Sequence, residues 1–124
     1  MTSDDGLVAN ASEVLEIAEV EPLLAPEADC PFTAKELDYA RSKSDPVRRL
    51  AARLAAKRAA VRLLGDDVPL VEVEILRGSG APRIELSTKA AARLQSLGAS
   101  RILVSLTHGR THAAAAVLLV RGSG

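Results

Sequence analysis

Short segments rich in β-branched or alternating apolar residues predict strands. The first is 13–17, Glu-Val-Leu-Glu-Ile, and the prolines at 22 and 26 predict an irregular connection after it. Further strands are predicted at 71–76, 83–86, 101–107 and 112–120. The segment Gly78-Ser79-Gly80 predicts a hairpin turn between the second and third strands, and a short polar loop joins the last two.

Helix signals separate these strands. Thr33 and Glu36 have the spacing of a capping box, which predicts a short helix over 34–41. The main helix is predicted over 46–64, with Asp-Pro at its start and a glycine after its end. A third helix begins after a serine cap at 87 and runs to about 97, where another glycine follows.

The apolar face of the main helix is interrupted by a cation. At 100° per residue, Lys57 lies in the middle of the apolar stripe, and Arg53 and Arg58 lie on its opposite flanks. The lysine either extends its ammonium group to solvent or points into a polar pocket, and the sequence leaves both open. The stripe itself consists of Val47, Leu50, Leu54, Val61 and Leu64.

Length and composition indicate one folded domain. We expect it to span 1–124, with 1–10 considered as a disordered segment and 122–124 as a linker. An antiparallel sheet packed on one long helix and shorter helices is an α+β fold. The chain is 48% hydrophobic and 26% charged, which excludes a disordered protein, and 2% aromatic, which disfavours stacking on single-stranded nucleic acid.

The distribution of charges and the cysteine content bear on where the protein is located in the cell. Charges interrupt every apolar run before the ~20 residues that a bilayer requires, and no basic secretory start is present, so we expect a cytoplasmic protein. Cys30 is the single cysteine and is either an inert thiol or a reactive one.

Eight acidic and no basic residues lie in 1–30, and all sixteen Lys and Arg follow. The acidic segment either packs on the basic helix of the same chain or a neighbouring subunit, or the basic surface binds a phosphate-rich ligand, and both can hold.

Four motifs in order give the chain a resemblance to a known family. They are Phe32-Thr-Ala-Lys-Glu-Leu-Asp-Tyr39, Arg53-Leu-Ala-Ala-Lys-Arg-Ala59, Gly80-Ala-Pro82 and Val104-Ser-Leu-Thr-His108. From about Ala11 to Val120, the sequence resembles the holo-acyl-carrier-protein synthases, the small phosphopantetheinyl transferases.

The resemblance implies a reaction and a site. The 4′-phosphopantetheine arm of coenzyme A moves to a serine of an acyl carrier protein, for fatty acid or polyketide synthesis, in a trimer with active sites between subunits and Mg²⁺ at the pyrophosphate. The resemblance places catalytic positions at Glu13, Lys57 and Arg58, with Glu13 as a metal ligand.

The implied coenzyme A site comprises Arg53, Arg62, Gly80, Pro82, Ser105, Thr107 and His108, and Lys57 is a further candidate for phosphate contact. Two of these residues also have simpler interpretations, Arg62 as a solvated helix residue and His108 as a turn residue.

Three positions depart from the family pattern. Glu13 replaces an aspartate ligand of the metal, Glu19 replaces an arginine near the carrier, and Arg58 replaces a second metal-binding carboxylate. A guanidinium 4 Å from a divalent ion would be opposed by about 8 kcal/mol at an effective dielectric of about 20. We therefore expect Arg58 either to pair with Glu13 or to bind the pyrophosphate directly.

Two functions remain open at this level. One is an active transferase. The other is a catalytically degraded relative that acts as a coenzyme A-binding, structural or regulatory subunit in a homotrimer or heteromer. The altered charges favour the second, and the motifs favour the first. Nucleic-acid binding is disfavoured because the net charge is zero and no recognition motif is present.

Overall fold

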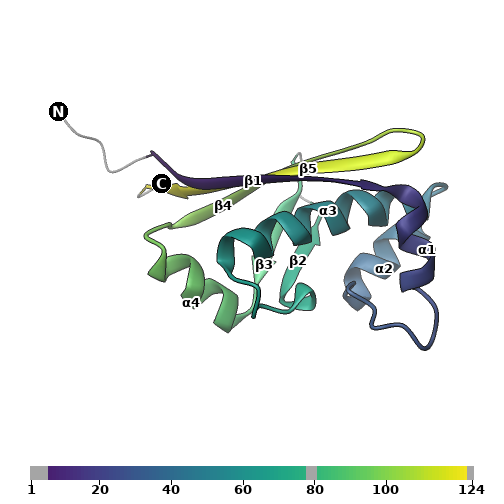
Figure 1. Cartoon of the computed structure of the whole chain (residues 1–124), viewed down its shortest axis with the longest axis horizontal. Helices are drawn as coiled ribbons and strands as arrows, with labels where there is room; N and C mark the ends of the chain where they lie inside the picture. The colour runs from purple at the N-terminus through teal and green to yellow at the C-terminus, as the bar shows by residue number, and fades with distance from the viewer. Residues whose placement is uncertain (1–5, 78–80, 123–124) are drawn as a thin grey trace.

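The computed structural model of the chain describes residues 6–77 and 81–122. Its helical and extended elements follow the predicted order (Figure 1). The strands are β1 (Gly6–Glu16), β2 (Val73–Leu76), β3 (Arg83–Leu86), β4 (Arg101–His108) and β5 (His112–Arg121). The helices are η1 (Ile17–Glu19), α1 (Val20–Leu23), α2 (Ala34–Arg41), α3 (Pro46–Leu64), η2 (Leu70–Glu72) and α4 (Thr88–Ser96).

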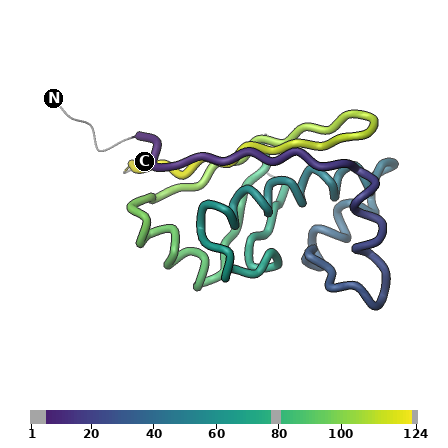
Figure 2. Tube along the Cα trace, viewed as in Figure 1, coloured from purple at the N-terminus to yellow at the C-terminus, as the bar shows by residue number. Residues whose placement is uncertain are grey.

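The strands form two antiparallel sheets, whereas the sequence predicted one. β1, β5 and β4 pair in that order, and the short strands β2 and β3 pair only with each other. α4 lies between β3 and β4 along the chain, and these two strands do not pair. The two ends of the described chain lie side by side, since Gly6 is paired with Arg121 (Figure 2). The α+β class is confirmed.

α3 forms the centre of the molecule and packs against β1, β4 and β5. Its alanines are fully buried, which lets the sheet approach the helix backbone closely. Alternate residues of β5 point toward the helix, as the period of a strand requires. The buried side chains at this contact include Ala55, Ala56, Ala59, Ala113, Ala115, Val117 and Leu119.

The opposite face of the three-stranded sheet, here called the outer sheet face, carries no helix (Figure 1). Val14 is 66% exposed on this face, and Leu103 and Leu118 are also exposed. Ser105 and Thr107 follow Leu103 at alternate positions of β4 and are exposed as well. A single chain therefore leaves an apolar sheet surface in contact with solvent.

Several predicted details are corrected. β1 begins at Gly6, so residues 6–10 belong to a strand that pairs with β5, with an irregularity between Leu7 and Ala9, and are not a disordered segment. Asp45 occupies the N-cap of α3, but its carboxylate makes no cap hydrogen bond because it accepts from Arg49 instead. Residues 20–23, expected to be irregular, form α1. The predicted turn at 78–80 lies outside the described residues.

The capping box of α2 is confirmed. Thr33 accepts a hydrogen bond from the Glu36 amide, and the Glu36 carboxylate accepts one from the Thr33 amide. Within the described residues, no helix is long and apolar enough to cross a bilayer.

Candidate functional site: a basic pocket and an arginine cluster

A pocket of about 500 Å³ opens where α2, α3 and the ends of three strands meet. We call it the basic pocket, because among its described lining residues four are lysine or arginine and none is acidic. α2 and the turn after it contribute Tyr39 and Lys43, and the end of β4 contributes His108. The described residues that line it are Tyr39, Lys43, Arg49, Ala52, Arg53, Arg77, Pro82, Leu106 and His108.

Arg53 is the buried cation of this pocket. Only 5% of the residue is exposed, and its Nε has no hydrogen-bond partner among the described residues. Its guanidinium lies 4.3 Å from the centre of the Tyr39 ring, and its Nη1 donates a long bond of 3.5 Å to the Arg49 carbonyl. Burial lowers the pKa of Arg53, since desolvation penalises the charged form. Within residues 6–77 and 81–122, no carboxylate pairs with this guanidinium, so it is available to bind an anion.

Arg49 holds the rim of the pocket in place. Its Nε donates to Asp45 Oδ1 at 2.9 Å, and its Nη1 donates to the Tyr39 hydroxyl at 3.0 Å. The hydrogen bond from Arg49 to Asp45 lowers the pKa of the Asp45 carboxyl. Burial would raise the pKa of Tyr39, but attraction to Arg49 and Arg53 outweighs it, so the pKa lies below its ordinary value. His108 Nε2 lies 4.0 Å from Asp45 Oδ2 on the same side.

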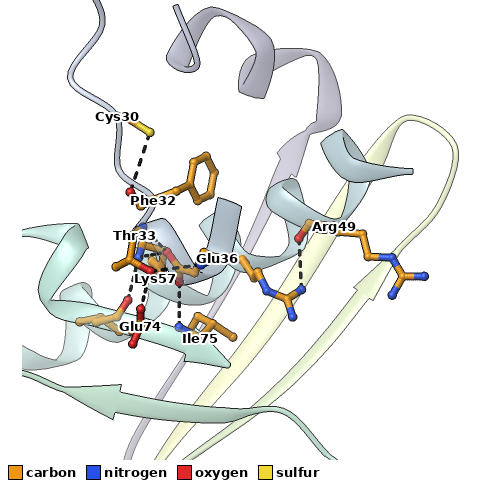
Figure 3. A network of polar contacts seen from close by, with 10 residues as sticks. Cys30, Phe32, Thr33, Glu36, Arg49, Lys57, Glu74 and Ile75 are labelled. Carbon is orange, nitrogen blue, oxygen red and sulfur yellow. Dashed lines mark hydrogen bonds and ion pairs between the residues drawn. The ribbon is translucent and has the colours of Figure 1, made fainter. Parts of the chain in front are cut away.

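Lys57 lies outside the pocket, in the core beneath it. Its side chain is fully buried, and its Nζ donates to Glu36 Oε1 at 2.7 Å and to the Val73 carbonyl at 2.8 Å (Figure 3). The same carboxylate of Glu36 accepts from the Ile75 amide, so the network ties α2 and α3 to β2. Burial lowers the pKa of Lys57, and Glu36 opposes that shift. Of the two interpretations that the sequence left open, the extension to solvent is wrong, and the ammonium points instead into a buried polar network.

A second group of charges lies across α3 from the basic pocket. This arginine cluster consists of Glu13, Glu19, Arg58 and Arg62. Arg62 pairs with Glu13 and donates to the Ser12 carbonyl, whereas Arg58 Nη1 contacts Glu19 Oε1 at 3.4 Å. The predicted Glu13–Arg58 pair is therefore wrong, because Arg62, one turn along the helix, pairs with Glu13 instead. Glu13, Arg58 and Arg62 line one cavity of about 480 Å³.

The structure thus divides the predicted site residues among several places. Arg53, Pro82 and His108 meet in the basic pocket, while Glu13, Arg58 and Arg62 meet in the arginine cluster. Ser105 and Thr107 lie on the outer sheet face, opposite Ala116 and Ala114 of β5. Gly80 lies outside the described residues.

Four pocket residues were missed in the sequence: Tyr39, Lys43, Arg49 and Arg77. Arg49 and Arg53 are four positions apart on the predicted main helix, a spacing that aligns side chains on one face, and this was the available signal for Arg49. Tyr39 ends the first of the four motifs, whereas nothing local distinguishes Lys43, which follows the end of α2 at Arg41, or Arg77.

The amino-acid sequence is similar to those of several named proteins. A holo-[acyl-carrier-protein] synthase of Nitratidesulfovibrio vulgaris (strain DP4) is 48% identical over 81 residues, which are 61% of this chain and 65% of the relative. One of Anaeromyxobacter sp. (strain K) is 38% identical over 121 residues, which are 90% of this chain and 94% of the relative. The chain belongs to the holo-acyl-carrier-protein synthase family. No family model matches the sequence.

Solved holo-acyl-carrier-protein synthases have the same fold. The enzyme of Neisseria meningitidis superposes with a TM-score of 0.78 at 20% identity, covering 92% of this chain and 98% of its own. That of Helicobacter pylori, in complex with coenzyme A, gives 0.73 at 18% identity, covering 90% and 99%. These similarities confirm the fold expected from the resemblance.

The magnesium ion expected for a holo-acyl-carrier-protein synthase does not fit the arginine cluster. A divalent ion of this kind requires several oxygen ligands. Glu13 is paired with Arg62, and Arg58 brings a positive charge into the same cavity. In residues 6–77 and 81–122, no group of three or more His, Cys, Asp and Glu side chains is placed to hold a metal.

Proposed function

We propose that this chain is an active, cytoplasmic phosphopantetheinyl transferase that moves the 4′-phosphopantetheine arm of coenzyme A to a serine of an acyl carrier protein. Membership of the holo-acyl-carrier-protein synthase family supports the reaction. The observation that carries the proposal is the basic pocket, with the buried and incompletely bonded Arg53 at its base.

In this proposal, the basic pocket holds the phosphorylated adenosine end of coenzyme A. Lys43, Arg49, Arg53 and Arg77 supply positive charge, and His108 adds a ring nitrogen. Coenzyme A is strongly anionic, and arginine binds phosphate with two parallel hydrogen bonds. The coenzyme A complex of the Helicobacter pylori protein, which has the same fold, supports this ligand class.

The reaction is a phosphoryl transfer. The serine oxygen of the carrier forms a bond to the phosphorus that bears the pantetheine arm, and the bond from that phosphorus to the bridging oxygen breaks. The electron pair leaves with 3′,5′-ADP, and the serine proton passes to solvent. Negative charge grows on the leaving diphosphate oxygen, so fixed cations beside it lower the barrier.

The basic pocket and the arginine cluster can contact the same coenzyme A molecule only if two copies of the chain meet. Arg53 and Arg62 are nine positions apart on α3, which is about two and a half turns, so they lie on opposite sides of the helix. We therefore propose a homotrimer, assembled through the outer sheet face, in which the basic pocket of one copy faces the arginine cluster of the next. The exposed Val14, Leu103 and Leu118 provide the apolar contact.

The assembly is tested with Val14→Glu. A charge at this exposed position costs a single chain little, but a buried interface does not accept it. We expect light scattering to give a trimer for the wild type and a monomer for the variant, with unchanged circular dichroism and lost coenzyme A binding. A monomeric wild type would contradict the homotrimer, and trimers that require a second, related subunit would indicate the heteromer.

Activity is tested by incubating the protein with coenzyme A and an apo carrier protein and weighing the carrier. We expect a mass gain of one phosphopantetheine arm. Arg53→Met should reduce the rate, whereas Arg48→Met, on an exposed position of α3 that lines neither cavity, is the matched control. Coenzyme A should also raise the melting temperature of the wild type by mass action. Coenzyme A binding without any mass gain would instead indicate the degraded, regulatory relative.

A further inference from the structure

Arg58 is the more weakly held of the two arginines in the cluster. Arg62 is engaged by both the Glu13 carboxylate and the Ser12 carbonyl. Among the described residues, Arg58 has a single polar partner, Glu19 at 3.4 Å, and its side chain is 36% exposed. Such an exposed ion pair contributes little to stability, so a more highly charged anion can replace Glu19 as the partner of the guanidinium.

Glu19 does not depend on Arg58. Its other carboxylate oxygen, Oε2, accepts a hydrogen bond of 3.0 Å from the Glu16 amide, which belongs to the capping box of η1. When Arg58 turns away, Glu19 keeps this bond and its contact with solvent. The Glu19–Arg58 pair can therefore open without leaving a buried charge unpaired.

The position of Arg58 determines which ligand it serves. It lines the same cavity as Glu13 and Arg62, where the fold family implies a metal at the pyrophosphate. A fixed guanidinium and a divalent cation repel each other there, whereas a guanidinium and a diphosphate attract each other and form paired hydrogen bonds. Arg58, in place of the family's carboxylate, thus neutralises the diphosphate directly instead of through a metal ion.

We infer that this chain binds the diphosphate of coenzyme A through the Arg58 guanidinium, released from Glu19, and without a divalent cation. The inference rests on the proposed function, since it needs coenzyme A in the cleft between two copies. Arg62 stays with Glu13 and adds its charge to the same cavity.

Calorimetry with coenzyme A tests the inference in buffers containing either excess Mg²⁺ or excess EDTA. The wild type should bind with dissociation constants that agree within about twofold. Arg58→Met should weaken binding about tenfold in both buffers, with Arg58→Lys intermediate because it keeps the charge and loses the paired bonds. Arg48→Met should bind as the wild type does.

A second ligand separates the two cavities. 3′,5′-ADP lacks the diphosphate bridge, so Arg58→Met should bind it with wild-type affinity, whereas Arg53→Met should bind it more weakly. Coenzyme A binding that requires Mg²⁺, or an Arg58→Met variant with wild-type affinity, would overturn the inference and leave the proposed function intact. Wild type that binds coenzyme A in neither buffer would overturn both.

Discussion

Replacing Lys57 by methionine should destabilise the fold and spare the ligand site. The resemblance placed this lysine among the catalytic residues, but its ammonium is fully buried between Glu36 and the Val73 carbonyl. Methionine has a similar length and no charge. Its introduction leaves the Glu36 carboxylate in the core with the Thr33 and Ile75 amides as its remaining donors among the described residues (Figure 3).

The magnitude follows from the burial of both partners. Removing one member of a buried, hydrogen-bonded ion pair costs about 3–5 kcal/mol, chiefly because the remaining charge is left without compensation. A domain of this size is stable by only about 5–15 kcal/mol. The loss should therefore lower the melting temperature by roughly 10–20 °C.

Urea denaturation measures the effect, with Arg48→Met as the exposed control on the same helix. Adding Glu36→Gln to Lys57→Met should recover part of the loss, with a coupling energy of at least about 2 kcal/mol in the double-mutant cycle. Below the melting temperature, Lys57→Met should bind coenzyme A as the wild type does. A variant that is as stable as the wild type but no longer binds coenzyme A would refute the structural role.

Three further predictions concern the frame around the site. Gly65→Ala should destabilise the protein in thermal denaturation, because Gly65 has φ +130° and a Cβ there would clash with Arg93 Nη1. The bond from Arg93 lowers the pKa of Asp67 from 3.8 to about 2, so this carboxylate stabilises the fold above about pH 4 and the contribution is lost between about pH 4 and 2. Asp67→Asn should flatten this part of the stability curve, and an unchanged curve would show that Asp67 carries no such coupling. Thr33→Ala should cost about 1 kcal/mol or more in urea denaturation, since Thr33 caps α2 and also bonds Glu74, and Thr33→Ser should restore most of it.

Most of the elements could be predicted from local patterns. α2 and α3 have the predicted bounds, because the signals that start and end a helix are carried by a few adjacent residues. The start of β1 was missed, because residues 6–10 become a strand through their pairing with β5, which lies more than a hundred positions away. The division into two sheets likewise depends on which strands pair, and local patterns do not specify the partner of a strand.

The site could be predicted only as a set of residue types. The sequence by itself determined that α3 carries cations on several faces and that a positive charge stands at position 58 where the family pattern has a carboxylate. Only the tertiary structure decided which anion each cation meets: Lys57 meets Glu36 in the core and Arg62 meets Glu13, whereas Arg53 pairs with no carboxylate in the part of the chain that the structure describes. The physical reason is that helix formation is governed by neighbours along the chain, whereas the pairing and desolvation of a charge depend on groups brought close by packing.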